Sequence, residues 1–461
     1  MSDLSRRTFI QLAGASLICG CGSSITIPGS TSYPLLAFSD LHFNPLFDPT
    51  LVASLDSAEP DQWASIFETS QLNTPSAFGS DTNYALLMLA LASIGRNRGA
   101  SPFILYTGDL LGHGISYYYP LYSKNNDVAA MRKFTDKAVS FVTQQIRSAA
   151  GDVPVFFAVG NCDSYTGYGP DSTFLGNTAD TFYTQLLQGS ADRPAFLDSF
   201  TRGGYYAAEP LGTNIMVIGL NTIEFSPLVQ NQDGSENNAA AVNAELAWFD
   251  AKLASAKATD KKVWLLMHAP PGADEGTTAK SVGANGHLAS ATMMWEANYQ
   301  ATFLRTLAKY PGVLTMTLAG HTHMDEFRIM SAGNVVEIVP GISPVFGNDP
   351  AYKIFDIGRS TLAPIDYSAF NYDQNAATSN GFGNYYKFSE DYPSKGSLGS
   401  SLEPLCPSLA TDSALQSVYR GHYCSGHNAS NPITDINWAV YWAGIGNMWG
   451  PDLTNAVNSY S

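Results

Sequence analysis

The sequence predicts an α/β fold in which helices cover a largely buried β-sheet. Short apolar runs, rich in branched and aromatic residues and bounded by Gly, Asp, Asn or Pro, are typical of buried strands. Several of these runs alternate with stretches of helical periodicity, a pattern typical of layered α/β proteins. The chain has 461 residues, of which 45% are hydrophobic, and this is enough for one large domain or two.

The expected elements follow one another along most of the chain. The predicted strands are 35–39, 103–107, 153–159, 215–220, 263–267, 313–318 and 335–339. The predicted helices are 83–97, 128–148, 239–257 and 296–309. After about residue 360 the composition shifts to Tyr, Asn, Ser and Gly, with one further helix expected at 412–420. We therefore interpret 33–360 as the main domain and 361–461 as a C-terminal extension packed on it.

The N-terminal segment has the form of an export signal. Arg6 and Arg7 precede an apolar stretch, 9–18, that ends in small residues and is too short to cross a bilayer. Residues 5–10 resemble the twin-arginine signal, which directs folded proteins across a membrane. We expect residues 1–20 to be a signal peptide and the protein to be exported.

A cysteine at the end of this segment suggests lipidation. Residues 18–21 resemble a lipobox, in which lipid is attached to the last cysteine, here Cys21, although Cys19 stands where that pattern usually has Ala, Ser or Thr. Residues 21–32 would then be a tether that holds the protein on the outer side of the cytoplasmic membrane. The alternative is a plain cleavage site that leaves a soluble periplasmic protein.

Charge and cysteine content narrow the classes of partner and compartment. The net charge of -16 repels nucleic-acid backbones, so we expect no nucleic acid partner. Cys406 and Cys424 are near enough in sequence to form a disulfide in an oxidising compartment, but two free thiols are an equal alternative. Cys162 would then stay unpaired.

Side chains suited to metal binding follow five of the predicted strands. They are Asp40 and His42, then Asp109 and His113, then Asn161 with Cys162 and Asp163, then His268, and finally His321 and His323. In sheets of this type ligands gather at the carboxyl ends of the strands, so these groups can converge. Each fragment alone is a weak signal, because such residues also occur at turns and helix caps. Their occurrence after five buried strands favours a common site.

The residue types indicate a pair of metal ions. Residues two apart in extended chain point the same way, so Asp40 and His42 can hold one ion, and His321 and His323 can straddle two. Imidazole and carboxylate suit zinc, iron and manganese, and one aspartate can bridge a metal pair. Two ions about 3.5 to 4 Å apart can activate a water and clamp a phosphoryl group. The sequence thus predicts hydrolysis of a phosphorus ester.

Five short blocks resemble the signature motifs of the calcineurin-like metallophosphoesterases: SDLH, TGDLLGH, VGNCD, LMHAPPG and AGHTH. Within that superfamily the chain is most similar to the acid sphingomyelinase-like phosphodiesterases. His113, the HAPPG block and the segment 340–358 support this likeness, which spans about 33–426. The cysteine-rich saposin domain of the sphingomyelinases is absent. The resemblance implies a layered sandwich of central mixed β-sheets flanked by helices.

The resemblance also implies roles for individual residues. The first metal would be held by Asp40, His42 and His323, and the second by Asn161, His268 and His321, with Asp109 bridging the two. Zinc is expected for both divalent ions, with iron or manganese as alternatives. The Asn161 amide would help to stabilise charge on the phosphoryl oxygens. His113 is the candidate general acid for the leaving alcohol, and its alternative role is a supporting hydrogen bond.

Cys162 departs from the family pattern, which has a histidine between the Asn and the acidic residue. That histidine touches substrate and helps to protonate the leaving group, so its loss could cost about 10² to 10⁴ in rate. Because this histidine is missing, His113 becomes the more important candidate for protonating the leaving group. Cys162 itself is interpreted as a small buried neighbour of the site, with metal ligation or redox control as the alternatives. Asp163 is expected to orient a neighbouring ligand.

The functional hypothesis is an exported phosphoric diester hydrolase, sphingomyelinase-like, that acts on a small phosphoester or a phospholipid head group. A phosphomonoesterase, or a polyphosphate or nucleotide phosphohydrolase, is an alternative because the same metal core serves these reactions. A non-catalytic surface lipoprotein that kept the fold would explain Cys162.

Overall fold

The structure is a computed structural model that describes residues 31–228, 239–331, 333–376 and 381–460. The predicted export signal and most of the tether lie outside the described residues. None of the helices in the described part of the chain combines the length and apolar character of a membrane span.

The first sheet has the strand order β12-β11-β10-β1-β2-β3. Its parallel part consists of β1 (Ser32–Phe38), β2 (Ile104–Tyr106) and β3 (Val155–Phe157). Its antiparallel part consists of β10 (Ala351–Gly358), β11 (Pro364–Asn371) and β12 (Gly383–Lys387). Pairing of β1 with both β2 and β10 makes this a mixed sheet.

The second sheet has the strand order β4-β5-β6-β7-β9-β8. Its strands are β4 (Tyr206–Ala208), β5 (Ile215–Gly219), β6 (Lys262–Leu266), β7 (Leu314–Ala319), β8 (Glu326–Ser331) and β9 (Asn334–Ile338). The four central strands are parallel, and the two edge strands run antiparallel to their neighbours. Side chains of both sheets, including Phe38, Phe157, Trp264 and Leu318, belong to one buried apolar core.

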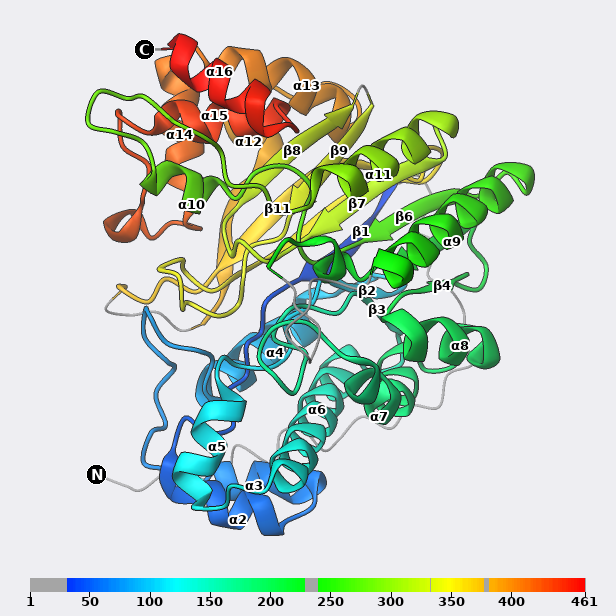
Figure 1. The fold of residues 1–461 in the computed structure, drawn as a ribbon, viewed down its shortest axis with the longest axis vertical. Helices are drawn as coiled ribbons and strands as arrows, with labels where there is room; N and C mark the ends of the chain where they lie inside the picture. Colours follow the sequence, from blue (N-terminus) through cyan, green and yellow to red (C-terminus); the bar gives the residue numbers. More distant parts are fainter. Residues whose placement is uncertain (1–30, 229–238, 332, 377–380, 461) are drawn as a thin grey trace, which may run out of the picture. The chain divides into compact units, whose positions relative to one another are not determined.

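Helices flank both sheets (Figure 1). Before β7 they are α2 (Val52–Ser57), α3 (Trp63–Phe67), α4 (Tyr84–Asn97), α5 (Ile115–Ser123), α6 (Val128–Ala150), α7 (Ser172–Phe182), α8 (Arg193–Gly203), α9 (Ala239–Ala258), α10 (Glu275–Lys280) and α11 (Ala297–Lys309). The later ones are α12 (Phe388–Asp391), α13 (Leu398–Leu409), α14 (Ser413–Tyr423), α15 (Trp438–Gly446) and α16 (Gly450–Tyr460). Short 3-10 turns lie at Pro49–Leu51, Pro60–Gln62, Thr222–Phe225 and Asn428–Ser430, and a π-helical turn lies at Tyr183–Leu187.

Local sequence signals account for the long helices. The Asn83 side chain accepts a hydrogen bond from the Leu86 amide and so caps the start of α4. Asp127 caps the start of α6 in the same way, and Gly151 follows its last residue with a positive φ of 66°, which suits a residue without a Cβ. The buried side of α6 carries Phe134 and Val142.

The seven predicted strands and the five predicted helices are all present, with boundaries shifted by a few residues. The fold prediction of mixed sheets flanked by helices is confirmed. The structure adds β11 and β12, which belong to residues 361–461 yet extend the first sheet beyond β10. The C-terminal segment therefore completes a sheet, and the division at residue 360 remains a prediction. Cys406 and Cys424, for which a disulfide was one of two alternatives, are free thiols.

A buried lysine forms ion pairs that connect the two sheets near the predicted metal ligands. Lys353 of β10 is fully buried, and its Nζ lies 2.8 Å from Asp325 Oδ1 and 2.9 Å from Glu337 Oε2. Asp325 follows the last predicted metal ligand by two residues, and Glu337 lies in β9 of the second sheet. Such a buried group of three charges is stable only when all its members remain in place, because a lone charge there would lack hydration.

Candidate metal centre

The predicted ligands lie in loops that leave the strands at their carboxyl ends, and the backbone turns sharply there. Five of them have a positive φ, namely Asp40 (49°), His42 (41°), Asp109 (60°), His321 (75°) and His323 (66°). Non-glycine residues seldom adopt this conformation, which costs about 1 to 3 kcal/mol each and is concentrated at functional sites. The strained turns bring these side chains back towards one point.

Asp40, His42 and His323 form the first cluster. His323 Nε2 lies 3.0 Å from His42 Nε2 and 3.4 Å from Asp40 Oδ1, and all three side chains are buried. The carboxylate and imidazole donor atoms face one another within 4.8 Å, close enough to hold one metal ion.

Asp109, Asn161, His268 and His321 form the second cluster. Asp109 Oδ2 lies 3.1 Å from His268 Nε2. Asn161 Oδ1 lies 3.2 Å from His268 Nε2 and 2.8 Å from His321 Nδ1. The metal-binding atoms of Asp109, His268 and His321 also lie within 4.8 Å of one another.

Asp109 connects the two clusters. Its Oδ2 lies 3.2 Å from His42 Nε2 in the first cluster and 3.1 Å from His268 Nε2 in the second. One carboxylate oxygen is therefore in reach of both candidate metal positions. The structure brings all seven predicted ligands together, from the ends of five strands.

Three of the four histidine rings are oriented as metal ligands. His42 Nδ1 faces the carbonyl oxygen of Leu111 at 3.2 Å, and His268 Nδ1 faces that of Thr107 at 2.7 Å. His323 Nδ1 likewise faces a carbonyl oxygen at 3.0 Å. Because a carbonyl only accepts, each Nδ1 carries the proton and each Nε2 can turn its lone pair to the centre.

The electrostatics of the centre fit cations. Burial lowers the pKa of His321 and His323 to about 4, so both rings are neutral, the form that binds metal. Burial also favours a lower pKa for His268, but the Asp109 carboxylate has the larger effect and raises the pKa of His268 to about 9. The buried carboxylates thus attract positive charge to this point, and a metal ion would displace the proton. The donors present fit two divalent cations.

Neighbouring groups fix the positions of the loops that carry the ligands. Asp163, predicted to support a ligand, accepts hydrogen bonds from the Leu110 amide at 2.8 Å and the Gly160 amide at 2.8 Å. A Cβ at Gly160 would collide with Asp109 Oδ1, so a residue with a side chain would displace the bridging carboxylate. Glycine at this position lets two ligand loops approach each other closely.

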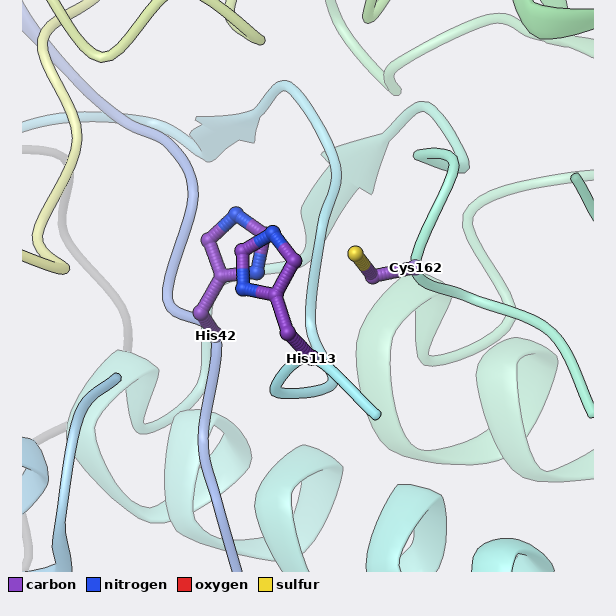
Figure 2. Close-up of side chains that lie close together, drawn as sticks. All are labelled: His42, His113 and Cys162. Carbon is purple, nitrogen blue, oxygen red and sulfur yellow. The ribbon is translucent and has the colours of Figure 1, made fainter. Parts of the chain in front are cut away.

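His113 and Cys162 lie beside the first cluster (Figure 2). The His113 ring stacks on His42 with 4.4 Å between ring centroids, and the Cys162 side chain points towards both rings from the loop after β3. The metal-binding atoms of these three residues lie within 4.8 Å of one another. The Cys162 amide also donates to Asp109 Oδ1 at 2.8 Å.

Asp81 holds His113 and was not identified from the sequence. Its Oδ1 lies 2.8 Å from His113 Nδ1, and its Oδ2 accepts from the His113 amide at 2.7 Å. Burial disfavours the imidazolium, but the Asp81 carboxylate prevails and raises the pKa of His113 to about 10. No motif surrounds Asp81, which precedes His113 by 32 residues. Only the tertiary contact reveals its role.

A cavity of about 460 Å³ opens onto these residues. His42, Asp109, His113 and Asn161 line one end of it. Its other walls include the α10 residue Glu275 and the C-terminal residues Tyr423 and Tyr441. The C-terminal segment therefore contributes to the surroundings of the centre as well as to the first sheet.

Comparison with known families defines the class. Residues 33–325 match the calcineurin-like phosphoesterase family. The chain belongs to this family, and the resemblance noted in the sequence is confirmed.

Among curated proteins the chain is similar to sphingomyelinase-type phosphodiesterases. It is 24% identical over 312 residues to sphingomyelinase phosphodiesterase C of Dictyostelium discoideum, covering 63% of this chain and 62% of that protein. It is 24% identical over 364 residues to human acid sphingomyelinase-like phosphodiesterase 3b, covering 74% of this chain and 72% of that protein. It is 23% identical to human sphingomyelin phosphodiesterase, and this match covers 72% of the chain and 50% of that protein. The match thus spans half to about three quarters of these relatives.

Among solved structures, a dimetal phosphatase from Danio rerio is similar at 15% identity, with a TM-score of 0.42, covering 78% of this chain and 98% of that one.

Proposed function

We propose that the protein is a dinuclear-metal phosphoric diester hydrolase that acts on a small phosphoester or a phospholipid head group. The observation that carries the proposal is the position of Asp109 Oδ2, in reach of His42 and His268 at once. The names of the similar curated proteins, which are phosphodiesterases, support the diester as substrate.

The residues divide the chemistry between them. Two divalent cations, zinc or alternatively iron or manganese, would supply an activated water and stabilise charge on the phosphoryl oxygens. Asp40, His42 and His323 would hold one, Asn161, His268 and His321 the other, with Asp109 shared. The Asn161 amide would also bind a phosphoryl oxygen.

His113 acts on the leaving group. As the water oxygen attacks phosphorus in line, the bond from phosphorus to the alcohol oxygen breaks, and that oxygen takes a proton from His113 Nε2. Asp81 binds Nδ1 of the same ring, so Nε2 is the nitrogen that would make this transfer. Cys162 lacks the positive charge of an imidazolium and does not replace this donor.

Hydrolysis of bis-p-nitrophenyl phosphate and of p-nitrophenyl phosphate tests the proposal. Zinc-loaded protein should cleave the diester faster than the monoester, and a chelator should abolish both activities until metal is restored. Faster cleavage of the monoester would favour the phosphomonoesterase alternative. Hydrolysis of neither ester, nor of a phospholipid diester, by metal-replete protein would favour a non-catalytic lipoprotein.

The proposal includes export to the outer side of the cytoplasmic membrane, with Cys21 as the candidate lipid anchor. The paired arginines and the lipobox-like residues support it. Replacement of Arg6 and Arg7 by Lys should leave the protein in the cytosol of its host. Cys21→Ala should release it from the membrane fraction, and membrane association that persists in this variant would contradict lipidation.

A further inference from the structure

A sulfur atom lies beside the first cluster of candidate ligands, and the proposed mechanism gives it no task. Cys162 is only 3% exposed, and its side chain points towards the His42 and His113 rings (Figure 2). The Asn161 side-chain amide donates to Cys162 Sγ at 3.4 Å, so the sulfur faces the candidate ligands. The metal-binding atoms of Cys162, His42 and His113 lie within 4.8 Å of one another. A sulfur and an imidazole nitrogen outside the seven predicted ligands are therefore close together.

The His113 ring is held as the rings of metal-binding histidines usually are. Asp81 Oδ1 lies 2.8 Å from His113 Nδ1. A histidine that binds metal almost always donates its second ring N–H to a carboxylate, a carbonyl or water, which fixes the ring and makes the ligating nitrogen more basic. His113 Nε2 is thus the nitrogen that would bind an ion. The His113 side chain is 41% exposed and lines the cavity, so an ion can reach it from solvent.

The donor pair of Cys162 and His113 selects a particular class of cation. A thiolate together with an imidazole suits thiophilic ions such as Zn²⁺ and Cu⁺, and Cd²⁺ shares this preference. Zinc binds thiolate sulfur at about 2.3 Å and imidazole nitrogen at about 2.0 Å, so small side-chain rotations let one ion join the two residues. His42 is not needed for this ion, because its Nε2 belongs to the first cluster.

The local charge permits a further cation beside the two proposed divalent ions. Binding of a metal ion releases the thiol proton, so the Cys162 thiolate contributes one negative charge. The Asp81 carboxylate contributes a second one through its contact with His113. One divalent ion with these two groups forms a neutral unit, which limits its repulsion by the neighbouring cations.

We propose that Cys162 and His113 form an inhibitory site for a thiophilic cation, which is Cd²⁺, Cu⁺ or zinc in excess of two ions per chain. An ion on His113 Nε2 occupies the nitrogen that protonates the leaving alcohol in the proposed mechanism. The inhibition therefore rests on the proposed function, whereas the binding of the cation does not. The site depends on the cysteine by which this chain departs from the family motif.

Cadmium tests the site, because its bond to a thiolate gives an ultraviolet charge-transfer absorption that carboxylate and imidazole ligands do not give. Cys19 and Cys21 are replaced by serine in every protein compared, which leaves Cys162, Cys406 and Cys424. The zinc-loaded protein should take up one cadmium ion per chain with this absorption and should retain its zinc. Metal analysis after gel filtration measures both ions. Cadmium uptake in exchange for zinc would overturn the proposal.

Cysteine variants locate the bound ion. Cys162→Ser should lose the absorption and bind cadmium at least about tenfold more weakly, because a hydroxyl is a poor ligand for soft ions. Cys406→Ser is the matched control: Cys406 is also a free cysteine, but it lies in α13, outside the cavity lining, and its replacement should change neither property. An absorption that persists in Cys162→Ser would overturn the proposal.

A second variant covers the case in which Cys162→Ser does not fold. His113→Ala should keep the thiolate absorption but weaken cadmium binding about tenfold or more, since even the hydrogen-bond partners of metal ligands change affinity about 10-fold to 100-fold. An unchanged affinity in His113→Ala would overturn the two-residue site.

Hydrolysis measures the inhibition. Saturating cadmium should lower kcat of the zinc-loaded protein at least about tenfold for a diester with a poor leaving group, because such a group depends on protonation. The same loss is expected in Cys406→Ser, and a much smaller one in Cys162→Ser. Equal losses in the two variants would overturn the inhibitory role. If the protein cleaves no diester even without cadmium, the proposed function fails, and the cadmium absorption alone decides whether the site exists.

Discussion

At the scale of single residues, His113 is the side chain on which the proposed mechanism places the greatest demand. Cys162 stands where the family motif has a second histidine, so the proposed mechanism assigns protonation of the leaving alcohol to His113. Its orientation is set by Asp81 on one side and by the His42 ring on the other.

His113→Ala should slow diesters with poor leaving groups by about 10² to 10³ and p-nitrophenyl esters by less than about tenfold, because good leaving groups need little protonation. The measurement is kcat across a series of leaving groups of increasing pKa. An equal loss for all of them would assign His113 a supporting role only.

Asp349 gives a pH-dependent stability. Burial raises its pKa to about 7 in the folded protein, above the ordinary value of 3.8. Between these two pH values the folded state holds more protons than the unfolded state, so stability falls as pH rises through that window. Asp349→Asn should remove this pH dependence. As pH rises through the window, the free energy of unfolding of the variant should increase relative to that of the native protein by at most about 1.4 kcal/mol per pH unit.

Urea unfolding of both proteins at pH 4.5, 6 and 7.5 measures the difference, in which the pH dependence of metal binding cancels. A difference that stays constant over this range would show that Asp349 keeps an ordinary pKa.

At the scale of elements, the sequence predicted the parallel strands and the convergence of their ends. Buried parallel strands are continuous apolar runs, and their carboxyl ends meet at one edge. Strands β10 and β11 were not predicted, because charged residues such as Lys353, Asp356 and Asp366 interrupt their apolar pattern. Asp81 was also missed, because its role depends on a contact between distant segments.

The loop after β3 should tolerate no side chain at Gly160. Gly160→Ala should lower metal affinity at least about tenfold, because its Cβ would displace Asp109 from its place between the two clusters. Metal content after dialysis against graded chelator measures this. Gly176→Ala in α7 is the control, since an added Cβ there meets nothing within 4 Å, and it should retain metal. Equal metal retention by the two variants would contradict the role of Gly160.

At the scale of the whole molecule, the C-terminal segment is part of the folded unit that begins at Ser32. Strand β11 pairs with β10 along its length, and Trp438 and Leu402 of the later helices are buried in the core shared with both sheets.

A chain ended at residue 360 should therefore be insoluble or unfolded. It would expose the β10 edge and the apolar surface that α13 to α16 cover. Circular dichroism and limited proteolysis of the truncated protein, beside the full chain, measure the effect. A soluble, cooperatively unfolding truncated protein would show instead that 33–360 is an independent domain.

The position of the cavity wall along the chain sets an order of events during synthesis. Because the ribosome releases the polypeptide from its N-terminus, every candidate metal ligand, up to His323, emerges about a hundred residues before Tyr423 and Tyr441. The nascent protein thus acquires its candidate metal ligands first. The C-terminal residues that form the far wall of the cavity arrive only when translation is nearly finished.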